Sequence, residues 1–180
     1  MATIIFDFDD TIFDTRQLKK IIAEKLSSYG IDLEVVNNAY HESKGRVGNY
    51  ILNEHTNTLS QIHGFDVPKE FFAWFEDLPL DSYILPEHES MIKKLKNDKH
   101  ILILLTKGGN EFQNEKISRS GLEKYFDEVH ITSGEKHIYL SEKNFDGPVI
   151  FINDKKDENK KIKEHFPHFE VFENLKSFFE

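Results

Sequence analysis

The chain has 180 residues, no cysteine and a formal net charge of −9, from 23 Lys and Arg against 32 Asp and Glu. The lack of cysteine excludes disulfides, thiolate metal sites and a cysteine nucleophile, and the excess of acids argues against non-specific binding to nucleic acid. A hydrophobic fraction of 38% with 16 Phe supplies enough apolar surface for one ordinary domain, or for a core that carries a small appendage.

The sequence also argues against a membrane protein. No apolar run approaches the roughly 20 residues that a membrane-spanning helix needs. Met1 leads directly into an acidic motif and not into the basic and apolar segments of a signal peptide. We therefore expect a soluble, cytoplasmic protein with no membrane or nucleic-acid partner, and the sequence contains nothing that fixes an oligomeric state.

Four short apolar runs predict buried β-strands, at residues 3–8, 101–105, 128–132 and 149–152. The first and the last are apolar on both alternating faces, which is typical of strands that helices cover on both sides of a parallel sheet. A further short strand is predicted at residues 169–172. Helical patterns separate and follow these runs, at residues 86–96, 110–119, 135–143, 155–165 and 174–180. This alternation predicts a doubly wound α/β fold with a parallel sheet.

Residues 15–85 interrupt the alternation, because they contain several helical patterns and no convincing strand. One of these patterns is an aromatic-rich helix after Pro68, at a position that favours a helix start. A polar stretch at residues 41–46 is predicted to lie between helices, where Lys44 or Arg46 either reaches a substrate anion or is an ordinary solvated charge. We therefore predict a catalytic core of residues 1–14 and 86–180 and a small α-helical domain of residues 15–85.

Chemistry-bearing residues follow three of the predicted strands. Asp7, Asp9 and Asp10 end the first strand, and ligand sites in parallel α/β sheets lie beyond the carboxyl ends of the strands. A turn or helix cap would explain an isolated acidic pair equally well. However, residues 106–109 place a hydroxyl, a lysine and two glycines after the second strand, and residues 153–158 place a second acidic cluster after the fourth. Carboxylates suit Mg²⁺, whereas the hydroxyl, lysines and glycine amides suit a phosphate.

These strand ends resemble the haloacid dehalogenase-like superfamily, in its phosphatase branch. The first motif of that family, Asp-x-Asp-x-Thr, is matched by residues 7–11, and its second, a Ser or Thr that ends an apolar strand, is matched by Thr106. Lys136 is the best match to the third motif, in preference to the neighbouring Lys124 and Lys143. Asp154 matches the fourth motif, with Asp157 or Glu158 as the second acid. All four motifs occur in the expected order. Asn153 departs from the pattern, which often has Gly before the first acid of the fourth motif.

The resemblance implies a Mg²⁺-dependent phosphatase on a Rossmann-like core. Asp7 would attack phosphorus and form an aspartyl-phosphate, and Asp9 would act as general acid and then as general base. Thr106 and Lys136 would bind the phosphate. Mg²⁺ would be held by Asp7, the backbone carbonyl of Asp9, and Asp154. Dehalogenases of the superfamily generally lack the second acid, so Asp9 favours phosphoryl transfer.

The expected substrate is a small phosphorylated metabolite, hydrolysed as a phosphate monoester. In the family, a helical insert between the first and second motifs is a cap that closes over the site and selects the leaving group. Two alternatives remain open at this stage. One is a phosphotransferase or phosphomutase that passes the phosphoryl group to a sugar, and the other is a non-catalytic protein that binds a phosphate ligand on the same fold.

Overall fold

The computed structural model describes residues 1–48 and 50–179. The chain divides into two compact units, Met1–Thr15 with Asp81–Glu180 and Arg16–Leu80. Residues 81–85, which the sequence pattern assigned to the helical insert, belong to the first unit. They pair with the loop after the first strand, because Leu85 N–H donates to Ile12 O at 3.0 Å and Asp14 N–H donates to Tyr83 O at 2.7 Å.

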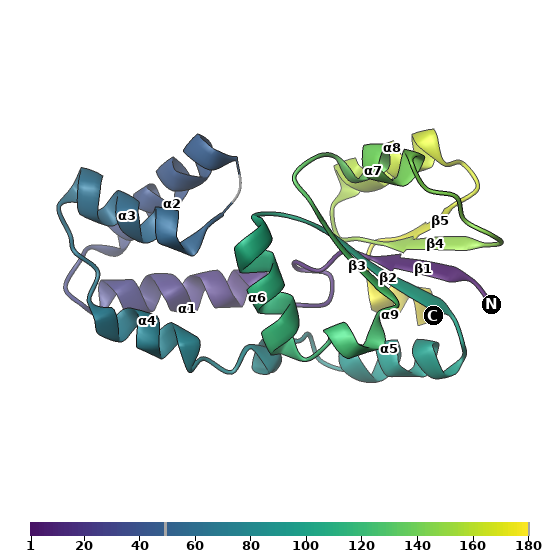
Figure 1. Ribbon diagram of the computed structural model, residues 1–180, viewed down its shortest axis with the longest axis horizontal. Coiled ribbons are helices and arrows are strands. Elements are labelled where there is room, and N and C mark those ends of the chain that lie inside the picture. The colour runs from purple at the N-terminus through teal and green to yellow at the C-terminus, as the bar shows by residue number, and fades with distance from the viewer. Residues whose placement is uncertain (49, 180) are drawn as a thin grey trace. The chain divides into compact units, whose positions relative to one another are not determined.

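The first unit contains a parallel sheet of five strands in the order β3-β2-β1-β4-β5 (Figure 1). The strands are β1 (Thr3–Phe6), β2 (Ile101–Lys107), β3 (Glu128–Thr132), β4 (Val149–Ile152) and β5 (Glu170–Phe172). The predicted doubly wound α/β fold is therefore confirmed. The first strand ends two residues earlier than predicted and the second ends two residues later, so that Thr106 and Lys107 are still paired with β3.

Helices cover both faces of this sheet. They are α5 (His88–Asn97), α6 (Asn110–Ser120), α7 (Lys136–Ser141), α8 (Lys156–His165) and α9 (Leu175–Phe179), with short 3₁₀ turns at Leu80–Tyr83 and Glu123–Tyr125. In Figure 1, α7 and α8 lie on one side of the sheet, and α5 and α9 lie on the other. On the α7 and α8 side, Ile5, Ile103 and Phe151 of the sheet form a buried cluster with Leu140 and Ile162 of the two helices.

The strand order positions a ligand site. The chain moves from the central β1 outward through β2 and β3, and then returns to the other side of β1 to add β4 and β5. Crevices at such a reversal, beyond the carboxyl ends of the strands, are the usual ligand sites of open α/β sheets. Phe6 pairs with Leu104 on one side and with Ile152 on the other, so the residues after these three positions meet at one edge.

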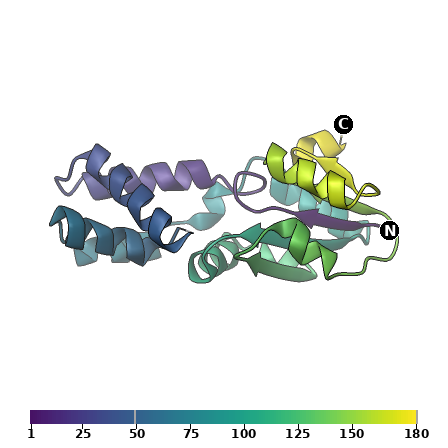
Figure 2. The ribbon, with the colours of Figure 1, turned by 90° about the horizontal axis from the view of Figure 1, so that it is seen from above.

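The second unit is helical, with α1 (Thr15–Ser27), α2 (Leu33–Val47), α3 (Leu52–His63) and α4 (Lys69–Glu76) (Figure 2). The described residues of this unit contain no strand, as predicted. The prediction that residues 41–46 lie between helices is wrong, because α2 continues through them. Asp32 caps the start of α2 through the Glu34 N–H, and Gly48 ends it with a φ of 76°.

The core of the second unit comes from the apolar faces of its helices. Leu18, Ile22 and Leu26 recur along α1 at helical spacing and are buried, as are Phe71 and Phe75 of α4. The aromatic-rich helix after Pro68 therefore places two of its rings in a core. Trp74 is only half-buried, with the Lys25 ammonium 5.6 Å from its ring centroid.

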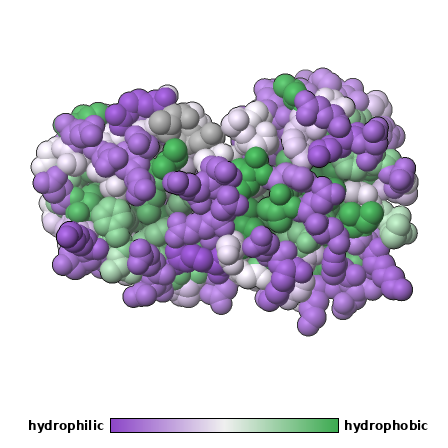
Figure 3. All heavy atoms as spheres, viewed as in Figure 1, coloured by the Kyte–Doolittle hydropathy of each residue, from purple (hydrophilic) through white to green (hydrophobic). Residues whose placement is uncertain are grey.

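Across residues 1–48 and 50–179, no helix combines the length and the apolar character needed to cross a membrane. On the face drawn in Figure 3, hydrophilic residues cover most of the surface and apolar residues form small groups between them.

Candidate active site

A tight turn after β1 builds the first part of the site. The carbonyl of Phe8 accepts the N–H groups of Ile12 and Phe13, both at 3.1 Å, and Asp10 takes a positive φ of 58°. The buried ring of Phe8 stacks on that of Phe13, with centroids 4.9 Å apart. The turn and this stacking together anchor the loop that carries Asp7 and Asp9.

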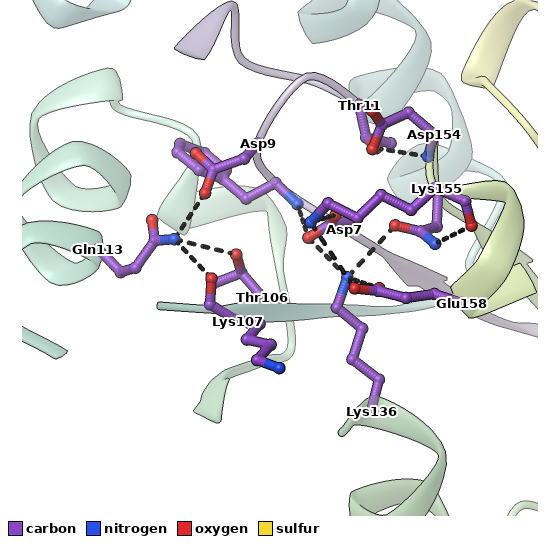
Figure 4. Close-up of polar contacts among 12 residues, drawn as sticks. Asp7, Asp9, Thr11, Thr106, Lys107, Gln113, Lys136, Asp154, Lys155 and Glu158 are labelled. Atoms are coloured by element: carbon purple, nitrogen blue, oxygen red, sulfur yellow. Dashed lines mark hydrogen bonds and ion pairs between the residues drawn. The ribbon is translucent and has the colours of Figure 1, made fainter. Parts of the chain in front are cut away.

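Asp7 has no exposed surface, and each of its carboxylate oxygens has a defined partner (Figure 4). Oδ1 accepts the Phe8 N–H at 2.8 Å and lies 2.8 Å from Lys136 Nζ. Oδ2 lies 3.4 Å from Lys155 Nζ. A buried carboxylate is costly unless it is paired, and this one is paired on both sides.

Lys136, the first residue of α7, is held by groups from the loop after β4 and from α8. Its Nζ lies 3.0 Å from Glu158 Oε2 and donates to Asn153 Oδ1 at 3.3 Å. Asn153 is oriented in turn by Asn159, whose Oδ1 accepts from Asn153 Nδ2 at 2.9 Å. Asn153, at the position where the family often has Gly, therefore helps to aim Lys136 at Asp7. Of the two candidate second acids, Glu158 contacts the site, whereas Asp157 is exposed.

Asp154 follows β4 and lies beside the loop after β1. Its backbone N–H donates to Thr11 Oγ1 at 3.1 Å, which joins the two loops. Burial, and after it the negative charge of Asp7, raise the pKa of Asp154 above its ordinary value. The pKa of Lys155 is raised as well, and this favours its charged form. Burial alone would lower its pKa, but the charges of Asp7 and Glu158, among other acids, raise it.

Asp9 lies toward helix α6 and has partners of its own. Its Oδ1 forms an ion pair with Lys116 and accepts the Thr15 hydroxyl, and its Oδ2 accepts Gln113 Nε2 at 2.6 Å. Burial would raise the pKa of Asp9, but the Lys116 charge and the hydrogen bonds of its three partners together lower it. The carboxylate is therefore held in one place in its charged form.

Thr106 is buried near the end of β2. Its Oγ1 accepts Gln113 Nε2 at 3.4 Å, which leaves the hydroxyl proton available to another acceptor. Lys107, the next residue, is exposed. A cavity of about 180 Å³ borders Lys136 and is lined by lysines, among them Lys107 and Lys161, and also by acids, among them Glu135 and Glu158.

The donor set fits a hard divalent cation. Asp7 and Asp154 bring two carboxylates to adjacent strand ends, and burial together with the charge of Asp7 already disfavours the charged form of Asp154. In the described part of the chain, no group of three or more Asp, Glu or His side chains could hold a metal ion. A metal here would therefore need a backbone oxygen and water besides the two carboxylates, which is the ligand set that Mg²⁺ accepts. The backbone carbonyl of Asp9 is the expected third protein ligand.

The structure thus joins Asp7 and Lys136 in one group of contacts, and Asp9 and Thr106 in a second group through Gln113. Asp154 lies at the adjacent strand end, where it contacts Thr11 and is affected by the charge of Asp7. Other residues that contact these groups were not assigned a role from the sequence: Gln113, Lys116, Asn153 and Lys155. The i, i+3 spacing of Gln113 and Lys116 on a predicted helix was a usable signal, because such residues share one face.

The sequence of residues 4–138 matches the family model described as "Haloacid dehalogenase-like hydrolase". This match covers more than half of the chain. The chain belongs to the haloacid dehalogenase-like hydrolases. No curated protein sequence matches it.

Solved structures agree with this family at the level of the fold. A Burkholderia xenovorans protein described as a haloacid dehalogenase-like hydrolase superimposes with a TM-score of 0.78 at 16% identity, over 94% of this chain and 80% of that one. The Bacillus subtilis HAD-hydrolase YfnB, bound to magnesium, superimposes with a TM-score of 0.67 at 17% identity, over 99% of this chain and 96% of that one. The L-2-haloacid dehalogenase of Xanthobacter autotrophicus, with chloropropionic acid covalently bound, superimposes with a TM-score of 0.59 at 14% identity, over 94% of this chain and 75% of that one. At these identities the superpositions show the fold alone.

Proposed function

We propose that this haloacid dehalogenase-like hydrolase is a Mg²⁺-dependent phosphatase, which hydrolyses a small phosphate monoester through an aspartyl-phosphate on Asp7. The observation that carries the proposal is the pair of carboxylates after β1, Asp7 and Asp9, each held by a different lysine. A dehalogenase needs the first carboxylate only. A second one, fixed two residues away, suits a reaction in which a leaving oxygen must be protonated.

Asp7 is the nucleophile in this mechanism. One of its oxygens attacks phosphorus and the bond from phosphorus to the leaving oxygen breaks. Asp9 must enter this step protonated, against the lowering of its pKa by Lys116, and it gives its proton to the leaving oxygen. In the second step Asp9 removes a proton from water, and the water oxygen displaces Asp7 from phosphorus to give inorganic phosphate. The acid and base roles of Asp9 thus alternate within one turnover.

Lys136 and Thr106 act on the phosphoryl oxygens. The Lys136 ammonium, 2.8 Å from Asp7 Oδ1, compensates negative charge where an anionic nucleophile meets an anionic substrate. Because Thr106 Oγ1 already accepts from Gln113, its proton is free to be donated to a phosphoryl oxygen. Asp7, Asp154 and the Asp9 carbonyl would hold Mg²⁺, which supplies positive charge that offsets the charge of the phosphate.

The test is release of phosphate from p-nitrophenyl phosphate by the wild-type protein, with Mg²⁺ or with EDTA. We expect activity only with Mg²⁺, and its loss in Asp7→Asn. Asp146→Asn is the matched control, because Asp146 is an exposed acid in the loop before β4, at the opposite end of the sheet. Full activity in Asp7→Asn would exclude the aspartyl nucleophile.

Two further assays separate the alternatives. Chloride release from 2-chloropropionate without phosphatase activity would favour a dehalogenase. A panel of sugar phosphates, nucleotides, phosphoglycolate and phosphoamino acids would identify the substrate class, and product analysis would distinguish phosphate release from transfer to a sugar.

A further inference from the structure

Helix α6 buries two polar side chains that the proposed reaction does not use directly. Gln113 and Lys116 are only 3% and 2% exposed. Their i, i+3 spacing places them on one face of the helix, which is directed at the loop after β1. A buried lysine without a partner is strongly unfavourable, so its position depends on what it contacts.

Lys116 is enclosed by aromatic rings and directed at one carboxylate. Its Nζ lies between 5.2 and 5.8 Å from the ring centroids of Phe8, Phe13 and Phe112. It forms an ion pair with Asp9 Oδ1. The ring faces attract the cation and exclude water, which strengthens its interaction with Asp9.

Gln113 holds the other oxygen of the same carboxylate. Its Nε2 donates to Asp9 Oδ2 at 2.6 Å, to Lys107 O at 3.1 Å and to Thr106 Oγ1 at 3.4 Å (Figure 4). Because all three partners can accept a hydrogen bond, they fix which end of the amide faces them. The Gln113 side chain therefore connects Asp9 with the end of β2, where Thr106 lies.

The backbone at Gly108 leaves room for this arrangement. A Cβ atom at Gly108 would lie 2.4 Å from Gln113 Nε2 and 2.6 Å from its Cγ, closer than real side chains approach each other. Any other residue at Gly108 would displace Gln113 from Asp9. This close fit shows that Gln113 reaches Asp9 through the space that Gly108 leaves open, and it is independent of the hydrogen bonds.

We propose that Gln113 and Lys116 are positioning residues, which hold the two oxygens of Asp9 so that its carboxyl group reaches the leaving oxygen. The inference rests on the proposed phosphatase function. Neither residue is assigned a contact with the substrate, and both act through Asp9. The opposing interpretation is a purely structural pair, which would stabilise α6 against the loop and have no specific effect on proton transfer.

The experiment combines Lys116→Met and Gln113→Ala with Asp9→Asn, singly and as double variants, and uses Asn114→Ala as the control. Asn114 is exposed on the same helix, where its Nδ2 donates to Asn110. The first-turnover release of the leaving group is measured for each variant with an alkyl phosphate, whose leaving group needs a proton, and with p-nitrophenyl phosphate, whose leaving group does not. The later general-base step of Asp9, which both substrates share, does not contribute to this rate. Thermal unfolding shows which variants fold.

We expect Lys116→Met and Gln113→Ala to lower the rate of first-turnover release from the alkyl phosphate by about 10- to 100-fold, with little change in KM and a smaller loss on p-nitrophenyl phosphate. In the Asp9→Asn background neither change should lower this rate further, because the group that they position is gone. Asn114→Ala should match the wild type.

Equal losses on both substrates, or losses that multiply in the Asp9→Asn background, would overturn the positioning role. An active wild type with unaffected variants would overturn it as well, and would leave the proposed function intact. A folded wild type without Mg²⁺-dependent phosphatase activity would overturn both proposals. If Lys116→Met does not fold, Gly108→Ala replaces it, since it displaces Gln113 without removing a charge.

Discussion

The buried ion pair between Lys136 and Asp7 offers a quantitative test of how the site is held together. The two charged atoms are 2.8 Å apart, and the side chains are 1% and 0% exposed. Lys136→Met keeps the apolar stem and removes the charge. Loss of one partner from a fully buried pair costs about 3–5 kcal/mol of the free energy of unfolding. We expect the lower end, about 3 kcal/mol, because Lys155 stays 3.4 Å from the other carboxylate oxygen.

The assay is equilibrium unfolding in urea at neutral pH, and a loss of this size leaves a domain of ordinary stability folded. Lys124→Met is the control, because Lys124 is 63% exposed and lies 3.9 Å from Glu89, and such surface pairs contribute about 1 kcal/mol or less. Asp7→Asn combined with Lys136→Met should recover much of the loss, since no unpaired charge then remains buried. A loss no larger than that of Lys124→Met, or strict additivity in the double variant, would refute the reasoning.

Two further predictions concern the cation. Burial and the charge of Asp7 raise the pKa of Asp154 in the folded protein above its value in the unfolded chain. The free energy of unfolding therefore falls as the pH rises from the unfolded pKa through the folded one, and this loss is absent at lower pH. Asp154→Asn should therefore raise the unfolding temperature in EDTA at neutral pH and abolish any increase caused by Mg²⁺. Lys155→Met should tighten Mg²⁺ binding about fivefold in calorimetry, because a charge 3.4 Å from Asp7, 43% exposed and so largely screened by solvent, is worth about 1 kcal/mol. Lys156→Met, with a side chain 79% exposed, should leave the Mg²⁺ affinity unchanged, and equal tightening in both variants would exclude a local effect.

The sequence was informative where one local pattern decides the structure. The apolar runs of β1 and β4 require cover on both faces, and that requirement leads to a parallel sheet with acids at its carboxyl edge. Asp7 and Asp154 could be placed at adjacent strand ends on this ground. Apolar periodicity is a weaker signal where a helix has a mostly polar surface. For this reason the sequence pattern did not predict that α2 continues through Gly45 and ends at Val47.

Contacts between distant segments could not be derived in this way. Gln113 and Lys116 are more than 100 positions from Asp9 in the chain, and helical spacing alone does not say what a face of a helix meets. Asn153 departs from the family pattern, yet its amide oxygen accepts from Lys136. The turn after Asp9, with a positive φ of 58° at Asp10, was likewise not predicted.

The chain has a net charge of −9, and the acids around the site are not equally paired with lysines. This difference bears on where a cation would bind. Lys116 faces Asp9, and Lys136 and Lys155 face Asp7, so the folded chain balances these two acids with lysines from separate segments. Asp154 differs, because burial and the charge of Asp7 disfavour its charged form despite the nearby Lys155. A divalent ion would offset the remaining negative charge at that point. If Mg²⁺ binds there, its effect on stability should depend on Asp154 and not on Asp9, whose carboxylate is already neutralised by Lys116.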